Sequence, residues 1–124
     1  MNILVLGLNP SAKHSSSKSL ETLWKWLDFL EVKYVSFDNI YPKYGKVIQN
    51  QIDKRYIREI SSESDRIIAL GQTVSSTLSS MGIDHFRLPH PSGLNRQLNN
   101  KKFLNQKLSR CLLYLELGDG NDFF

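Results

Sequence analysis

Cysteine, long apolar segments and internal repeats are scarce or absent in this chain of 124 residues. Its single cysteine, Cys111, excludes an internal disulfide and any iron–sulfur centre held by several cysteines, which favours a reducing cytoplasm. No trio of His, Asp or Cys has the spacing of a metal site, so we expect neither metal nor cofactor. The apolar opening, 1–8, lacks a basic leader and runs into Asn9 and Pro10, so it predicts a buried strand rather than a membrane span or export signal.

The composition is that of a small globular protein with a modest excess of positive charge. With 40% hydrophobic residues the chain can build one core, and we expect one domain over residues 1–117. The remaining tail, 118–124, is polar with two terminal aromatics and is either frayed or a docking peptide for a protein partner. Sixteen Lys and Arg against twelve Asp and Glu give a net charge of +4, which suits a polyanionic partner without requiring one.

Short apolar runs alternate with longer segments of helical periodicity along the chain. The runs that predict strands are 3–6, 34–37, 66–70 and 85–88. The segments that predict helices are 20–30, 47–60, 74–81 and 98–115. Continuous apolar runs are typical of strands covered on both faces, and strand–helix alternation favours a parallel sheet. The sequence therefore predicts an α/β fold, a three-layer α/β/α sandwich around a central four-stranded parallel sheet.

Polar and glycine residues follow each predicted strand at the point where a parallel sheet places its ligand site. The segments concerned are Gly7 to Ser11, then Asp38 with Asn39, then Gly71 with Gln72, and finally His90 to Arg96. Because the carboxyl ends of parallel strands meet at one edge of the sheet, we expect these four segments to converge on a single rim.

Two of these segments resemble the signature motifs of the uracil-DNA glycosylase superfamily. The first reads Gly7, Leu8, Asn9, Pro10, Ser11, and resembles the motif of the mismatch-specific and single-strand-selective branches. The second reads His90, Pro91, Ser92, Gly93, Leu94, Asn95, Arg96, and resembles the histidine form of the other motif. Order and spacing are similar too, over nearly the whole chain. The resemblance implies a monofunctional, metal-free DNA glycosylase that extrudes uracil or a related modified pyrimidine and leaves an abasic site. For so compact a protein we expect a monomer.

The resemblance also implies roles for individual residues. Asn9 would position the attacking water, His90 would hydrogen-bond the departing pyrimidine, and Leu94 would fill the space left by the extruded nucleotide. The segment 37–39 is similar to the strand that reads the uracil edge, which makes Asn39 the candidate reader. The remaining pocket residues would be Gly7, Leu8 and Pro10, and the remaining DNA contacts Ser11, Lys13, Ser92, Gly93, Asn95 and Arg96.

These residue types suit the chemistry of a glycosidic bond. Cleavage leaves negative charge on the pyrimidine, so a hydrogen-bond donor such as His90 stabilises the departing anion. The side-chain amide of Asn9 can hold water through its carbonyl oxygen but is too weak a base to activate it strongly. We therefore expect slow hydrolysis that depends mainly on stabilising the departing pyrimidine. Since a base inside a duplex is out of reach, extrusion and an apolar wedge are necessary parts.

A run of cations lies behind the predicted wedge. Its members, with no acid among them, are Arg96, Lys101, Lys102, Lys107 and Arg110. Lysine and arginine side chains at such positions contact phosphates and add a salt-dependent affinity that is independent of sequence. We expect part of this run to contact DNA.

The chain departs from the close branches in one motif position, and two other functions remain open. Ser11 stands where those branches usually have glycine, and the aromatic that stacks on the base has no clear counterpart, with Tyr41 and Tyr44 as substitutes. Trp24 and Trp26 are better explained as core and surface anchors, with Trp24 on the apolar stripe of its helix. The alternatives are a catalytically inactive DNA-binding relative, and a nucleotide-binding or nucleotide-hydrolysing α/β protein. A Gly-rich phosphate loop, absent here, would favour the latter.

Overall fold

We describe the protein from a computed structural model, which covers residues 2–8, 18–41, 51–91 and 99–118, with only the backbone described for 18–20. The strands are β1 (Ile3–Gly7), β2 (Ser36–Asn39), β3 (Arg66–Leu70) and β4 (Phe86–Leu88). The helices are α1 (Lys18–Phe29), α2 (Lys54–Ser62), α3 (Gln72–Ser80) and α4 (Lys101–Leu117). Strands and helices alternate along the described chain, as the apolar pattern predicts.

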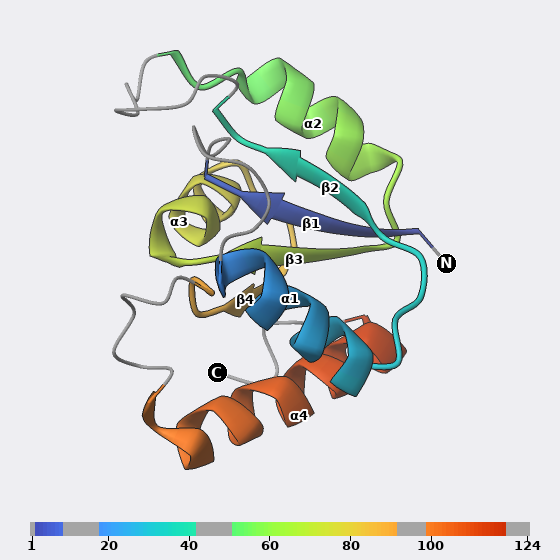
Figure 1. Cartoon of the computed structure of the whole chain (residues 1–124). Helices are drawn as coiled ribbons and strands as arrows, with labels where there is room; N and C mark the ends of the chain where they lie inside the picture. Colours follow the sequence, from blue (N-terminus) through green and yellow to red (C-terminus); the bar gives the residue numbers. More distant parts are fainter. Residues whose placement is uncertain (1, 9–17, 42–50, 92–98, 119–124) are drawn as a thin grey trace.

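The four strands form one parallel sheet in the order β2-β1-β3-β4 (Figure 1). In the central strand β1, Val5 lies opposite Phe37 of β2 on one side and Ile68 of β3 on the other. The chain moves outward from β1 to β2, then crosses back to β3 and continues to β4. The boundary between β1 and β3 is therefore a topological switch point, where open α/β sheets hold their ligands.

Alternate residues of the strands face two separate helical layers. In β1, Ile3 and Val5 pack in a core with α1 and α4, whereas Leu4 and Leu6 pack in a second core with α2 and α3. All four of these side chains are buried, each worth about 1.5–3 kcal/mol relative to exposure. Burial on both faces explains why the strand reads as a continuous apolar run. The predicted three-layer α/β/α sandwich is confirmed.

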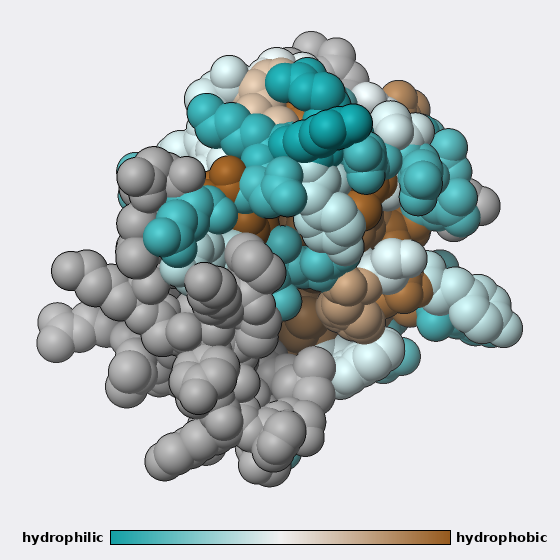
Figure 2. All heavy atoms as spheres, turned by 90° about the horizontal axis from the view of Figure 1, so that it is seen from above, coloured by the Kyte–Doolittle hydropathy of each residue, from teal (hydrophilic) through white to brown (hydrophobic). Residues whose placement is uncertain are grey.

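The helices bury one stripe each and leave the opposite face to solvent. In α1, Leu23 and Leu27 are buried with Trp26, while the neighbouring Trp24 is 48% exposed. The expected core Trp24 and surface Trp26 are therefore wrong, because Trp26 shares the buried helical stripe of Leu23 and Leu27. On α4, Cys111 lies in the core, and burial raises the pKa of its thiol to about 12. Seen from the α2 side, the described surface is mostly hydrophilic (Figure 2). No described helix combines the length and the apolar composition that crossing a bilayer requires.

Two of the differences between predicted and observed boundaries have a clear physical cause. The second strand is Ser36–Asn39 rather than 34–37: Tyr34 is 86% exposed ahead of it, while Asp38 and Asn39 lie inside it. Pairing with β1 sets this register, and it overrides the low strand propensity of Asp and Asn. The helix predicted from 47 begins at Lys54, because the Asp53 side chain accepts a hydrogen bond from the Tyr56 backbone N–H and caps it there. Residues 47–50 lie outside the described part.

Candidate functional site

The described part of the chain contains four of the predicted site residues. Gly7, Leu8 and Asn39 lie at the carboxyl ends of β1 and β2, and His90 follows β4 by two residues. The others lie outside the described residues: Asn9, Pro10, Ser11, Lys13, Ser92, Gly93, Leu94, Asn95 and Arg96. The structure therefore describes the strand ends that carry the site, and the two motif-bearing segments continue directly from them.

On the β1–β2 side, the Asn39 amide lies over the end of β1. Gly7 is paired with Asn39, and the Asn39 Oδ1 is 2.8 Å from the position that a Cβ on Gly7 would occupy. The backbone N–H groups of Ile40 and Tyr41 donate to the carbonyl oxygens of Gly7 (3.0 Å) and Leu8 (2.9 Å), which holds the two strand ends together. Among the described residues, no hydrogen bond joins the Asn39 side chain to another residue.

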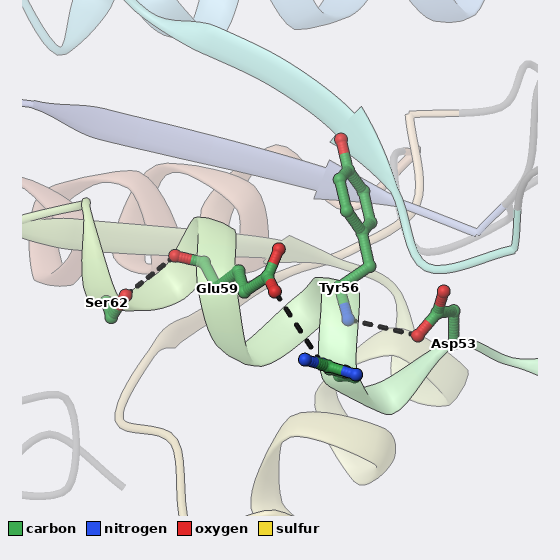
Figure 3. A network of polar contacts seen from close by, with 5 residues as sticks. Asp53, Tyr56, Glu59 and Ser62 are labelled. Carbon is green, nitrogen blue, oxygen red and sulfur yellow. Dashed lines mark hydrogen bonds and ion pairs between the residues drawn. The ribbon is translucent and has the colours of Figure 1, made fainter.

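Asp38 anchors the end of β2 from the other face of the sheet. The Tyr56 phenol points from α2 toward β2 (Figure 3). Its hydroxyl donates to the Asp38 carboxylate. The same carboxylate accepts the backbone N–H of Asn39 at 2.8 Å. The hydrogen bond to Asp38, more than any burial, raises the pKa of Tyr56. Asp38 thus positions the backbone of the candidate reader, a role that the sequence pattern did not indicate.

On the β3–β4 side, His90 lies over the end of β3. Gly71 ends this strand with φ +90°, and its N–H donates to the Leu88 carbonyl oxygen at 2.8 Å. A Cβ on Gly71 would lie 3.5 Å from the Cβ and 3.8 Å from the Cδ2 of His90. Pro89 and Pro91 on either side of His90 are buried, and the fixed φ of proline restricts the backbone that carries the imidazole.

The imidazole of His90 is reached by solvent, yet it is crowded enough for partial burial to lower its pKa from the usual 6.5. Desolvation disfavours the charged form of a histidine. At neutral pH His90 is therefore neutral, with one ring N–H as a donor and one ring nitrogen as an acceptor. A neutral donor of this kind can stabilise an oxyanion without first surrendering a proton.

These two halves meet at the switch point. Gly7 ends β1 and Gly71 follows β3, and the spacing and rise of neighbouring strands place their Cα atoms about 6 Å apart. From the outer strands, the side chains of Asn39 and His90 each lean over the glycine of the adjacent inner strand. The prediction that polar segments after the strands converge on one rim holds for these described residues. The two glycines matter because a side chain at Gly7 or Gly71 would lie against the side chain of Asn39 or His90.

Two other residues have structural partners of their own. Tyr41, a substitute for the missing stacking aromatic, is only 2% exposed, and its hydroxyl donates to Gln51 at 3.2 Å. A ring buried in the core cannot stack on a base, so that expectation is wrong for Tyr41.

His85, the other described histidine, has partners within the fold. Since the Ile83 carbonyl can only accept, the His85 Nδ1 donates to it at 2.9 Å, and the His85 Nε2 accepts from the Ser75 hydroxyl at 2.7 Å.

No protein-family model matches the chain, and no curated protein matches it. Within the described residues, no group of three His, Cys, Asp or Glu side chains gathers as a set of metal ligands. Among the described residues, the rim offers the amide of Asn39, the imidazole of His90 and backbone groups.

Proposed function

We propose that this chain is a DNA glycosylase of the uracil-DNA glycosylase kind, which hydrolyses the bond between an extruded uracil, or a related modified pyrimidine, and its sugar. One observation carries the proposal: the Asn39 amide and the His90 imidazole lean over neighbouring glycines at the switch point. The two segments with the resembling motifs begin at Gly7 and at His90, which both belong to this site. A planar base held there would meet a donor and acceptor pair on one side and an imidazole on the other.

The amide of Asn39 suits the edge of uracil. Uracil presents a carbonyl oxygen beside a ring N–H, and a side-chain amide offers the matching NH₂ donor and carbonyl acceptor. Cytosine presents the opposite arrangement of donor and acceptor at this edge, so a fixed amide orientation rejects it. The orientation is supported by the Asp38 carboxylate, which holds the Asn39 backbone, and by Tyr56, which holds Asp38.

The imidazole of His90 suits the departing base. Negative charge develops on a pyrimidine carbonyl oxygen as the bond to the sugar breaks, and a donor placed there stabilises the transition state. The lowered pKa keeps His90 neutral near pH 7, so the ring N–H acts as a hydrogen-bond donor and not as an acid. In this proposal Asn9 holds the attacking water and Leu94 occupies the vacated stack, each in the segment that adjoins the described rim.

The direct experiment is base release from uracil-containing oligonucleotides. The protein is incubated with single-stranded and double-stranded substrates, and abasic sites are detected by alkaline cleavage. We expect slow release that falls sharply in Asn9→Ala and His90→Ala. His85→Ala is the matched control, since this second described histidine is engaged by Ser75 and Ile83 away from the rim. If base release is unchanged in both Asn9→Ala and His90→Ala, the mechanism is rejected. If the protein binds DNA but releases no base, a non-catalytic relative is favoured.

A further inference from the structure

A cluster of cations covers the edge of the sheet formed by β4. Arg87 belongs to β4 itself, which is an edge strand, and Lys107 and Arg110 belong to the helix α4 beside it. The Lys107 Nζ lies 5.7 Å from the centroid of the Phe86 ring. Burial, then the positive charges of Arg87 and Arg110, lower the pKa of Lys107, so each arginine is close enough to repel this lysine.

Few acids offset this repulsion. The helix α4 carries no Asp or Glu before Glu116, close to its last residue. Among the described residues no ion pair joins Arg87 or Arg110 to a carboxylate, whereas Arg55 of α2 does pair with Glu59, at 3.9 Å. Arg87 and Arg110 thus place positive charge near Lys107 without an ion pair of their own among the described residues, and binding an anion would relieve the repulsion. The cluster therefore has the electrostatics of a site for a polyanion.

The cations extend from the candidate site along the sheet edge. The helix α4 begins on the rim side and runs back: Lys107 reaches the start of β4, and the Tyr114 hydroxyl reaches Ile67 near the start of β3. Lys101 and Lys102 in its first turn are exposed at the rim end. From Lys101 to Arg110 the helix rises about 14 Å, the axial length of about four nucleotides in one strand of a duplex.

We propose that these residues, Arg87, Lys101, Lys102, Lys107 and Arg110, form a basic track that binds the phosphate backbone of DNA flanking the extruded nucleotide. The choice of DNA as the polyanion rests on the proposed function, whereas the track itself stands on the charge arrangement. The track adds Arg87, on the β4 edge, to the cations expected from the helix, and it gives the flanking strand a direction, from the rim toward the amino ends of the strands.

The test measures binding to an undamaged oligonucleotide over a range of salt concentrations. The track variant carries Arg87→Gln, Lys107→Met and Arg110→Gln; methionine keeps an apolar stem against Phe86. A contacted phosphate contributes about 0.7–0.9 to the slope of log affinity against log salt, so three lost contacts lower the slope by about 2–3. We expect affinity to fall by about tenfold or more at low salt. The control variant, Lys33→Gln, Lys54→Gln and Arg58→Gln, removes three exposed cations elsewhere and leaves the slope nearly unchanged.

A second variant guards against misfolding of the first. Lys101→Glu with Lys102→Glu changes only exposed side chains in the first turn of α4, where acidic residues favour the helix dipole. It should fold and still weaken binding. Equal losses in track and control variants overturn the proposal, and so does binding of the same cations to anionic vesicles but not to DNA. The probe contains no uracil, so the binding measurement does not depend on base release. The two proposals can therefore fail separately: the basic track in the binding assay, and the glycosylase activity in the release assay.

Discussion

The two edges of the sheet use polar groups in opposite ways. At the amino edge, the backbone N–H of Asn2 donates to Asp65 at 2.7 Å, and the Arg66 Nε donates to the Leu115 carbonyl at 3.1 Å. At the carboxyl edge, the Asn39 amide finds no partner among the described residues and lies instead over a glycine. Polar groups that hydrogen-bond within the protein stabilise the fold, whereas the Asn39 amide is available to hydrogen-bond a ligand.

Glycine and tyrosine mark the same contrast. At the carboxyl edge, Gly7 and Gly71 make room for side chains that lean in from the outer strands. At the amino edge, the large ring of Tyr114 fills the core, and its hydroxyl accepts the backbone N–H of Ile67 at 3.0 Å. Burial is the main reason that the pKa of this phenol rises to about 12. Substitutions at one edge should therefore affect activity, and at the other edge stability.

The largest effect on the carboxyl edge is expected from His90→Ala. Removing one donor to a developing oxyanion costs about 10²–10³ in rate in other enzymes, and we expect a loss of base release in that range. Thermal unfolding should change little, since solvent already reaches the imidazole. Single-turnover release from a uracil-containing oligonucleotide measures the first quantity and circular dichroism the second. A variant as active as the wild type would remove His90 from the site.

The matching change at the amino edge is Tyr114→Phe. It leaves the Ile67 N–H without the Tyr114 hydroxyl as its acceptor inside the core, a loss that costs about 1–3 kcal/mol. We expect a lower free energy of unfolding in urea and an unchanged rate of base release. Phenylalanine keeps the ring against Phe86, 5.7 Å away between centroids, so the measurement isolates the hydroxyl. If Tyr114→Phe lowered activity and left stability unchanged, the amino edge would not be the one that mainly affects stability.

A subtler change, Gly7→Ala, separates reading of the base from stability. The new Cβ would lie 2.8 Å from the Asn39 Oδ1, and the amide can move away because it is the free end of a side chain. We expect unfolding to change by less than about 1 kcal/mol, while discrimination between uracil and cytosine falls about tenfold or more. The ratio of release rates for the two bases measures this. A retained ratio would mean that Asn39 is not the reader.

Local pattern predicts the sheet better than it predicts the site. The runs 3–6 and 66–70 predict strands because burial on both faces leaves only apolar residues there. The position of β2 is different: Tyr34 suits a strand by its side chain, but pairing with β1 selects Ser36–Asn39. Backbone register is set by distant partners, which a local pattern does not contain.

Side-chain placement follows the same rule. The bond from Tyr56 to Asp38 joins residues 18 positions apart, through a helix and a strand whose approach depends on the whole fold. Asn39 and His90 are predictable as rim residues because each follows or ends an apolar run. Their lean over Gly7 and Gly71 is a property of neighbouring strands and follows only once the order β2-β1-β3-β4 is known.

The smallest expected effect is a pH dependence of stability at the carboxyl edge. Burial lowers the pKa of His90 in the folded state below its unfolded value near 6.5, so the unfolded chain takes up the proton first. The neutral form stabilises the fold fully above pH 6.5, and this contribution is lost as the pH falls through 6.5 toward the folded pKa. Solvent screening keeps it well under the roughly 1.4 kcal/mol that each pKa unit represents.

Comparison of melting temperatures at pH 7.5 and 5.5 measures this contribution. We expect His90→Gln to show a smaller decrease than the wild type, because glutamine cannot take up the proton. His85→Gln, which changes the other described histidine, should retain the decrease that His90 causes. If wild type and His90→Gln lose the same stability on acidification, the imidazole is not desolvated in the fold, and the case for a neutral donor at the rim loses its electrostatic support.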